Sequence, residues 1–204
     1  VFQCGSQQRS DKMFRHVCEL VLNGRIGELQ RIEVGFSPDE TCGMPPDMPV
    51  PKNLDYDKWL GQAPVKPYTE TRVHPQKGYD RPGWLRIRDY GHGMITGWGA
   101  HHIDIAQWGM NMGLSGPIEI EGVGEYNDPA THLWDVHIGF DITYRYANGV
   151  TLRVSDKLEG GDRFIGTEGS VFVTRGKMKS DPANLIDSEI PENGVHLYKS
   201  DDHK

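Results

Sequence analysis

The sequence lacks the features that mark membrane, nucleic-acid-binding and disulfide-stabilised proteins. No apolar run approaches the ~18 residues that a membrane span needs, and no basic segment followed by an apolar one opens the chain. The net charge of −7 would repel a phosphate backbone, and no stripe of lysine or arginine offsets it locally. We therefore expect neither a membrane nor a nucleic acid as partner.

Cysteine is scarce, and the three residues Cys4, Cys18 and Cys42 stand in unlike contexts. An odd number of thiols without a ligand spacing predicts free thiols rather than a disulfide framework or a zinc site. Free thiols favour a reducing compartment, so a cytoplasmic location is the expectation. The chain opens on Val1 without an initiator methionine, and both of its ends are expected to be cuts.

Motifs for dinucleotide binding, nucleophilic catalysis and metal binding are also missing. No GxGxxG follows a predicted strand, so nothing in this chain can hold a pyrophosphate in the Rossmann manner, and no GxSxG occurs. Nine histidines are present, but the adjacent His101 and His102 point about 100° apart on a helix. A helical metal pair needs a spacing of three or four residues. We expect no metal site.

The composition is that of a folded, loop-rich globular protein. Of the 204 residues, 36% are hydrophobic and 25% are charged, and the chain has 25 glycines and 13 prolines. A single domain of this size buries roughly 70% of the surface that its unfolded chain exposes. A substantial core with long functional loops is therefore expected.

The chain is expected to begin with a strand, a helix and a second strand. Residues 1–6 predict a buried strand, and residues 29–36 predict another. Between them, Ser10 or Asp11 can cap a helix that Gly24 can end. That helix is indicated by five apolar residues at helical spacing, which are Phe14, Val17, Cys18, Val21 and Leu22.

Loops are expected to fill most of the next stretch. Residues 38–53 are rich in proline and follow neither a helical nor a strand period. The segment LDYDKWLGQAP predicts a short helical turn that Gly61 and Pro64 end, and residues 65–95 predict a loop with scattered aromatics. The segment GAHHIDIAQWGM then has helical character.

The second half changes to the period of a strand. Apolar and polar residues alternate through 136–146, Asn148-Gly149 predicts a hairpin turn, and VTLRVS predicts the returning strand. The segment FIGTEGSVFV repeats this pattern around a turn at Glu168-Gly169, whereas residues 176–204 predict a loop or a ragged end. The fold class expected is α+β, with an antiparallel sheet that needs cover on at least one face.

The densest group of unusual residues is DYGHGMITGWGAHHIDIAQW, residues 89–108. Its glycines allow the backbone to turn tightly and to approach a ligand, and they lead into a helix that carries His101 and His102. At helical spacing His101, Asp104 and Trp108 share a face, so Asp104 could orient an imidazole that meets substrate. The alternative is a histidine that caps the helix or is hydrogen-bonded in the core.

Aromatic residues and arginines are interleaved in the same half of the chain. Aromatic planes with polar neighbours suit a sugar ring, whose C–H face stacks while its hydroxyls form hydrogen bonds. The alternative is that these aromatics only hold long loops against the sheet. The aromatics are Trp59, Tyr68, Tyr79, Trp84, Tyr90 and Trp98, and the arginines among them are Arg81, Arg86 and Arg88.

Five segments together resemble the Gfo/Idh/MocA oxidoreductase family: SQQRS, NGRIGELQRIEV, LDYDKWLGQAP, GMITGWGAHHIDIAQW and GTEGSVFVTR. The resemblance implies an N-terminal Rossmann domain that binds NAD or NADP, followed by an open-faced, predominantly antiparallel sheet with helices on one face. That second domain is of the dihydrodipicolinate reductase-like type and supplies substrate contacts and the subunit interface. Residues 1–26 would then be the last strand and linking helix of an absent Rossmann domain, and residues 27–204 the substrate-binding and oligomerisation domain.

The resemblance also implies roles for single residues. His101 matches the family's acid/base histidine, and Asp104 matches the acidic residue after it. The family's aspartate four positions before the histidine is Gly97 here, and its lysine in a Glu-Lys-Pro segment is absent. The resemblance implies Arg9 and Trp59 near the cofactor. The expected substrate-binding residues are Trp84, Arg86, Arg88, Tyr90, Trp98 and His102.

The function implied is that of the substrate domain of an NAD(P)-dependent sugar or polyol oxidoreductase, which would form a homo-oligomer through its sheet. NAD or NADP would bind the full-length parent, whereas this chain alone is expected to bind no cofactor and to be inactive. One alternative is an NAD-dependent glycosidase of the same family. Another is a redox-inactive sugar-binding or assembly module, which Gly97 favours.

Overall fold

The computed structural model describes residues 2, 4–77 and 81–199, and their contacts divide the chain into two compact units. The first, here called the sheet unit, comprises residues 1–37, 98–123 and 140–204. The second, here called the loop unit, comprises residues 38–97 and 124–139. Each unit is described by itself.

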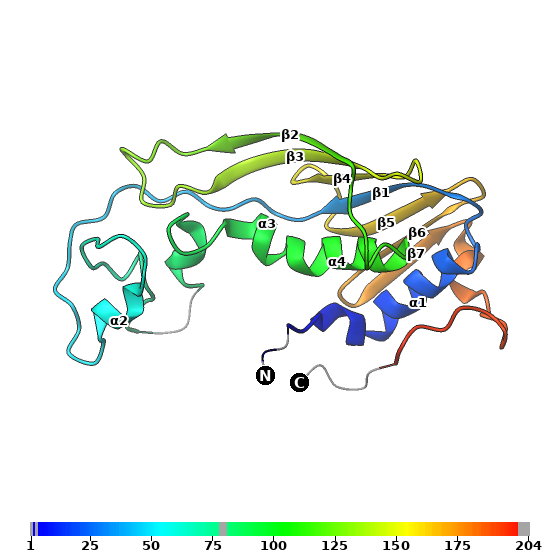
Figure 1. Cartoon of the computed structure of the whole chain (residues 1–204), viewed down its shortest axis with the longest axis horizontal. Helices are drawn as coiled ribbons and strands as arrows, with labels where there is room; N and C mark the ends of the chain where they lie inside the picture. Colours follow the sequence, from blue (N-terminus) through cyan, green and yellow to red (C-terminus); the bar gives the residue numbers. More distant parts are fainter. Residues whose placement is uncertain (1, 3, 78–80, 200–204) are drawn as a thin grey trace. The chain divides into compact units, whose positions relative to one another are not determined.

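Seven strands form one mixed sheet in the order β2-β3-β4-β1-β5-β6-β7 (Figure 1). β1 runs parallel to β4, and the pairs β1–β5, β3–β4, β5–β6 and β6–β7 are antiparallel. The strands are β1 (Leu29–Gly35), β2 (Glu119–Tyr126), β3 (His137–Arg145), β4 (Thr151–Ser155), β5 (Gly161–Gly166), β6 (Ser170–Thr174) and β7 (Lys177–Asp181). This confirms the expected α+β class with an open, mostly antiparallel sheet.

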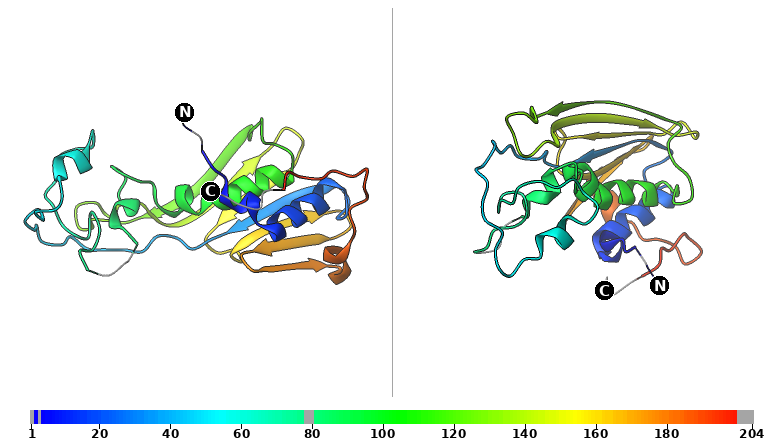
Figure 2. Two further views of the ribbon diagram at one scale, coloured as in Figure 1. Left: turned by 90° about the horizontal axis from the view of Figure 1, so that it is seen from below. Right: turned by 60° about the vertical axis from the view of Figure 1, so that its left-hand side comes forward.

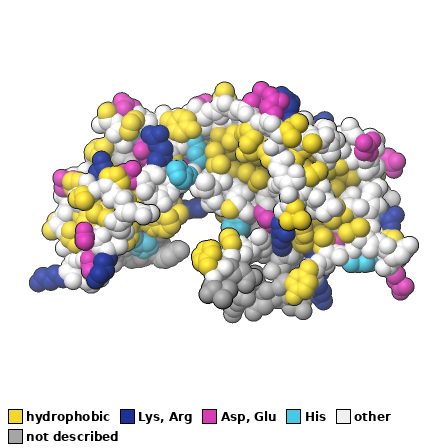
Figure 3. All heavy atoms as spheres, viewed as in Figure 1, with side chains coloured by type: hydrophobic (Ala, Val, Ile, Leu, Met, Phe, Trp, Pro, Cys, Tyr) yellow, Lys and Arg dark blue, Asp and Glu magenta, His cyan; other side chains and the backbone are white. Residues whose placement is uncertain are grey.

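The core of the sheet unit lies on one face of the sheet. Ile32 of β1 is paired with Leu152 of β4 on one side and with Phe164 of β5 on the other, and all three side chains are fully buried. The helices α1 (Lys12–Leu22) and α4 (Gly99–Gly109) cover this face (Figures 1 and 2). In the space-filling view, apolar side chains gather between the strands and these helices (Figure 3).

The opposite face of the sheet is polar because the strand period places charged residues there. Glu33 of β1 lies between Arg153 of β4 and Arg163 of β5 in the strand register. Arg153 also donates two hydrogen bonds to Asp141 of β3, at 2.9 and 2.6 Å. The sheet is therefore open-faced, with its helices on one side only.

Capping residues define where the helices begin and end. The carboxylate of Asp11 accepts hydrogen bonds from the backbone N–H groups of Met13 and Phe14, which fixes the start of α1. Asp55 caps α2 (Tyr56–Leu60) in the loop unit, and Gly61 ends that helix with a φ of 57°. The other helical segments are η1 (Gln7–Ser10), η2 (Gly83–Arg86), α3 (Gly93–Gly97) and η3 (Ala183–Asp187). None of the helices in the described ranges has the length and hydrophobicity needed to cross a bilayer.

Two expectations about the ends of the chain are wrong. Phe2 is 95% exposed and residues 4–6 are not in a strand, while Val1 and Gln3 lie outside the described residues. Residues 176–204 contain β7 and η3, where a loop was predicted. β7 has few apolar residues because it is an edge strand, and its backbone pairing with β6 holds it in place.

β2 is the strand that the sequence analysis did not anticipate. All eight of its residues are exposed, so the alternation of buried and exposed positions that reveals a half-buried strand is missing. By contrast, the hairpin predicted at Asn148-Gly149 joins β3 to β4 as expected, and Gly149 has a φ of 85°.

Candidate functional site

The residues predicted to form the site are divided between the two units. The sheet unit holds Arg9, Trp98, His101, His102 and Asp104. The loop unit holds Trp59, Trp84, Arg86, Arg88 and Tyr90.

His101 lies in the first turn of α4, with its side chain half-buried. Its ring meets the ring of Trp98 edge-on, with 5.9 Å between the centroids and 63° between the planes. Its backbone carbonyl accepts a hydrogen bond from Nε2 of Gln8 at 3.4 Å. Arg175 contacts both of these neighbours of His101. Its Nε donates to Oε1 of Gln8, and its guanidinium lies 4.5 Å from the ring centroid of Trp98.

This environment favours a neutral imidazole. Partial burial lowers the pKa of His101, and the positive charge of Arg175 and the neighbouring His102 lower it further, while Asp104 opposes the effect. A neutral imidazole can accept a proton from a substrate hydroxyl near neutral pH. His101 therefore has the chemical state that a general base requires.

Asp104 was predicted to orient His101, and its carboxylate is hydrogen-bonded to Arg9. Both of its carboxylate oxygens accept hydrogen bonds from Arg9, from Nε at 2.8 Å and from Nη2 at 2.6 Å. This bidentate geometry raises the pKa of Arg9, mainly through the hydrogen bond, and burial opposes the rise. Arg9 also lies 5.3 Å from the ring centroid of Trp108. The face shared by His101, Asp104 and Trp108, and the orienting role of Asp104, stay predictions.

His102 was predicted to bind substrate, and the structure places it in a buried position. His102 is only 4% exposed, and its ring is stacked on those of Trp98 and Phe36 at centroid distances of 5.9 and 6.4 Å. Its Nδ1 lies 2.7 Å from Oδ2 of Asp162 on β5. A buried ring held in this way presents almost no surface to a ligand, so the alternative of a histidine satisfied in the core applies to His102.

Asp162 is the functional-site neighbour that the sequence analysis missed. Its side chain is fully buried, and its Oδ1 has no hydrogen-bond partner among the described residues. Burial raises the pKa of Asp162 to about 6, and the hydrogen bond with His102 opposes that rise. No signal in the sequence indicated this residue, because Asp162 precedes the predicted strand segment FIGTEGSVFV.

Two predicted arginines of the loop unit differ in their surroundings. Arg86 is 9% exposed, lies 3.7 Å from Asp39 and 3.0 Å from Glu40, and stands over the ring of Trp134 at 4.4 Å. These contacts leave little of its surface for a ligand, and its substrate-binding role stays a prediction. Arg88 is half-exposed, and its backbone N–H and Nε both donate to Asp135, at 2.8 and 3.2 Å.

The aromatic residues of the loop unit pack on one another. The ring of Trp59 lies 5.0 Å from that of Tyr90 and 5.7 Å from that of Tyr56. The hydroxyl of Tyr90 is buried without a hydrogen-bond partner among the described residues. Trp84 lies in η2, with its side chain half-buried. For Trp59 and Tyr90 this geometry favours the alternative that aromatics hold the loops in place.

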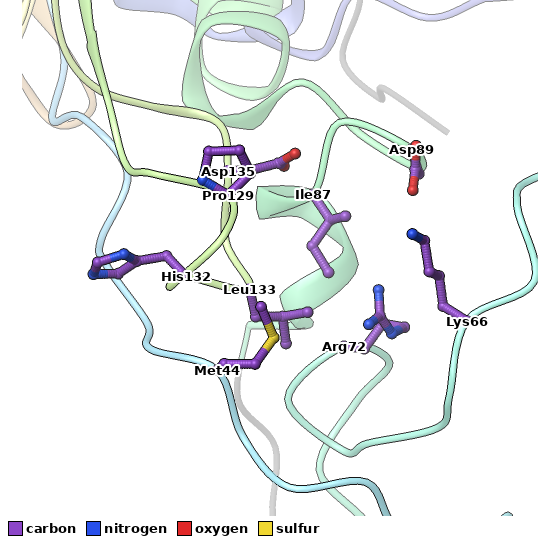
Figure 4. Close-up of a pocket in the computed structure, with 9 residues that line it drawn as sticks. All are labelled: Met44, Lys66, Arg72, Ile87, Asp89, Pro129, His132, Leu133 and Asp135. Atoms are coloured by element: carbon purple, nitrogen blue, oxygen red, sulfur yellow. The ribbon is translucent and has the colours of Figure 1, made fainter.

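Two cavities open within the loop unit. One, of about 150 Å³, is shown in Figure 4. The other, of about 210 Å³, is lined by Arg88, His92, Ile95, Thr96, Tyr126, Val136 and His137. Across the described ranges, no group of three or more histidine, cysteine and acidic side chains has a geometry that could hold a metal ion.

Comparison with known proteins identifies relatives of this architecture. The family model for the oxidoreductase family, C-terminal alpha/beta domain (Gfo/Idh/MocA), matches residues 40–193. The structure of GenD2 from gentamicin A biosynthesis, in complex with NAD, matches 83% of this chain at 17% identity with a TM-score of 0.50. The aldose-aldose oxidoreductase from Caulobacter crescentus, complexed with glycerol, matches 86% at 12% identity with a TM-score of 0.50.

The chain spans less than half the length of these solved relatives, 38% of the first and 43% of the second. No curated protein sequence matches it. At such low identity, the structural likeness supports the fold alone.

Proposed function

The chain belongs to the Gfo/Idh/MocA oxidoreductase family, and from that premise we propose that it is the substrate-binding and oligomerisation part of an NAD(P)-dependent sugar or polyol oxidoreductase. The observation that carries the proposal is His101, a half-buried histidine in the first turn of α4, inside the region that matches the family. Its lowered pKa leaves it free to accept a proton. The chemistry would be the transfer of a hydride between a substrate carbon and nicotinamide.

The residues of this chain would handle the proton of that reaction. A hydroxyl whose carbon loses a hydride must also lose its proton, and His101 is the group proposed to accept it or to orient the hydroxyl. Partial burial and, after it, the charge of Arg175 lower the pKa of His101 and so favour the neutral imidazole, and the ring of Trp98 limits the directions in which His101 can face. The Arg9–Asp104 pair ties η1 to α4 and so fixes the helix that carries His101.

The chain alone does not fit a nicotinamide cofactor. Arg9 and Trp59 were expected near the cofactor. The guanidinium of Arg9 already donates hydrogen bonds to both carboxylate oxygens of Asp104, and the ring of Trp59 packs against Tyr56 and Tyr90. No glycine-rich turn in the sequence can hold the pyrophosphate. We therefore assign the cofactor to another part of the whole protein, with residues 1–26 as the connecting segment and 27–204 as the substrate domain.

The substrate class is proposed from the relatives and from the loop unit. One relative is an aldose-aldose oxidoreductase that was crystallised with glycerol, and the other was crystallised with NAD. In this chain, Trp84 and Arg88 retain exposed surface for a sugar or polyol, and Tyr90 has a hydroxyl without a partner among the described residues. These features support a polyhydroxy substrate.

Self-association is proposed to occur through the open face of the sheet. That face carries ion pairs such as Arg153–Asp141, a polar surface of the kind that packs through a wet interface. The edge strand β2 adds exposed apolar residues, with Ile120 at 60% and Val123 at 74%. The surface therefore combines polar and apolar contacts.

A second candidate is a redox-inactive sugar binder, which Gly97 favours. A side chain would fit at this position, because the nearest atom to a Cβ built there is Nη2 of Arg81 at 3.7 Å. The absence of the aspartate that the family resemblance implies at this position therefore has no steric reason.

The experiment that separates these functions uses the full-length protein with a panel of sugars, sugar acids and polyols. Accumulation of NADH or NADPH with an oxidised product supports the oxidoreductase. Cleavage of a glycosidic bond without net cofactor reduction would instead indicate the NAD-dependent glycosidase. Ligand binding without turnover on every member of the panel would contradict the proposal and support the redox-inactive binder.

A further inference from the structure

A cavity of about 150 Å³ in the loop unit, here called the Arg72 cavity, has an unusual arrangement of charge. Figure 4 shows Lys66 and Arg72 on one side of it, with Asp89 above them and Ile87 beside them. Its full lining is Met44, Lys66, Arg72, Ile87, Asp89, Pro129, His132, Leu133 and Asp135. None of these residues has been assigned a role above, apart from the contact of Asp135 with Arg88.

Arg72 is a buried cation that lacks a carboxylate. It is 8% exposed, and its Nε donates to the backbone carbonyl of Pro67 at 3.2 Å. Its backbone N–H bonds to the carbonyl of Thr69, so both ends of the residue are fixed. Within the described part of the chain no acidic side chain forms an ion pair with it, in contrast to Arg86 and Arg88. A buried charge is costly unless it is paired, so this guanidinium is suited to an anion that enters from outside.

The second cation and the acceptors of the cavity complete the pattern. Lys66 is exposed at the rim and, like Arg72, forms no ion pair with the described acidic residues. The charge of Asp135 is already compensated by Arg88, which donates to both of its oxygens. Asp89 is exposed and can accept hydrogen bonds from hydroxyl groups. The cavity therefore offers two cations for an anionic group and a carboxylate for the hydroxyls beside it.

We infer that the Arg72 cavity binds the carboxylate end of a polyhydroxy acid. The carboxylate meets the guanidinium of Arg72 and the ammonium of Lys66, and adjacent hydroxyls donate to Asp89. A cavity of about this volume accommodates a molecule of about six non-hydrogen atoms, which matches the end of a sugar acid but not a whole disaccharide. The buried side chains of Ile87 and Leu133 supply the apolar wall against which the carbon chain lies.

The inference deepens the proposed function, because it identifies the polyhydroxy substrate as an acid. Binding to the cavity itself does not depend on redox activity. The proposed cavity and the proposed oxidoreductase activity can therefore be refuted independently, the first by the affinity for the acid and the second by turnover.

The test is calorimetry on this chain with D-gluconate and with D-glucitol, which has the same carbon chain but a hydroxymethyl group instead of the carboxylate. We expect gluconate to bind at least about tenfold more tightly, since hydrogen bonds to charged groups are the strong ones. Lys66→Gln and Arg72→Gln should each lower the affinity for gluconate by about tenfold and leave the affinity for glucitol unchanged. The matched control is Lys58→Gln, because Lys58 lies in the same unit, its side chain is 85% exposed, and its ammonium forms an ion pair with Asp55 outside the cavity lining.

Lys66→Gln keeps the test decisive if Arg72→Gln disturbs the loop, because Lys66 is exposed. Equal affinity for gluconate and glucitol, no binding of gluconate, or an unchanged affinity in Lys66→Gln would overturn the inference. Inorganic phosphate that binds as tightly as gluconate would also overturn it, because the hydroxyls would then contribute nothing. Gluconate binding with no turnover in the full-length protein would uphold the cavity and contradict the oxidoreductase.

Discussion

Replacing His102 by alanine should destabilise the chain far more than the same change at its neighbour His101. His102 is 4% exposed and its Nδ1 lies 2.7 Å from Oδ2 of Asp162, whose other oxygen has no partner in the part of the chain that the structure describes. Removing the imidazole therefore leaves a fully buried carboxylate without a hydrogen bond from any described side chain. Breaking a buried pair from one side costs about 3–5 kcal/mol.

His101 has no comparable partner to lose. Its ring is half-buried and contacts the edge of Trp98, and its hydrogen bond with Gln8 uses the backbone carbonyl, which alanine retains. We expect His101→Ala to cost about 1 kcal/mol or less. The two substitutions remove the same atoms from adjacent positions of one helix, so each is the control for the other.

Differential scanning calorimetry of both variants measures this contrast. A loss of about 3–5 kcal/mol corresponds to a decrease of roughly 6–20 °C in Tm for a chain of this length, whereas His101→Ala should lower Tm by no more than about 4 °C. Equal effects on Tm, or a larger effect at His101, would refute the assignment of His102 to the core. The same result would place the Asp162 pair in doubt.

Three further predictions concern the sheet unit. The pKa of Asp162 is about 6 in the folded state and exceeds its unfolded value, so its contribution to the free energy of unfolding is greatest below about pH 4 and declines as pH rises to about 6. Urea titrations should show this decline for the wild type but not for Asp162→Asn. Identical pH profiles of the two proteins would contradict the prediction. Gly109→Ala should lower the free energy of unfolding, measured in urea, by about 1–3 kcal/mol, because its Cβ would lie 2.5 Å from Cε1 of the fully buried Phe164. A gain in stability would contradict this and show that the helix accommodates the methyl group without strain. Sedimentation of the wild type should show self-association, and Arg153→Glu should weaken it because the new carboxylate would face Asp141. A wild-type protein that stays monomeric at every concentration measured would contradict an interface through the sheet.

The parts of the fold that were predictable are those in which apolar and polar residues alternate along the sequence. Residues 136–146 predicted β3 because of this alternation, and Asn148-Gly149 specified its turn. β2 and β7 lie at the edges of the sheet. All residues of β2 are exposed and those of β7 are exposed or half-buried, so neither strand has a buried face that hydropathy would reveal. β2 and β7 form because their backbones pair with a neighbouring strand, and the sequence of the strand itself does not reveal that pairing.

The helix that carries the candidate site was predictable, but the partners of its side chains were not. The segment GAHHIDIAQWGM predicted a helix, and α4 is found there. The partner of Asp104 is Arg9, 95 residues earlier, and the partner of His102 is Asp162, 60 residues later. Such contacts depend on how η1 and β5 pack against α4, and local spacing contains no information about them.

The most direct test of the account is the kcat of the full-length protein with His101 replaced by alanine, followed as NAD(P)H formation on the substrate identified from the panel. A general base that accepts the hydroxyl proton contributes about 10²-fold or more, so kcat should fall by at least that factor. His102→Ala, assayed at a temperature at which it remains folded, should act chiefly on KM or on stability. A kcat for His101→Ala within a few-fold of the wild type, or an equal loss at both positions, would contradict the central claim that His101 handles the proton.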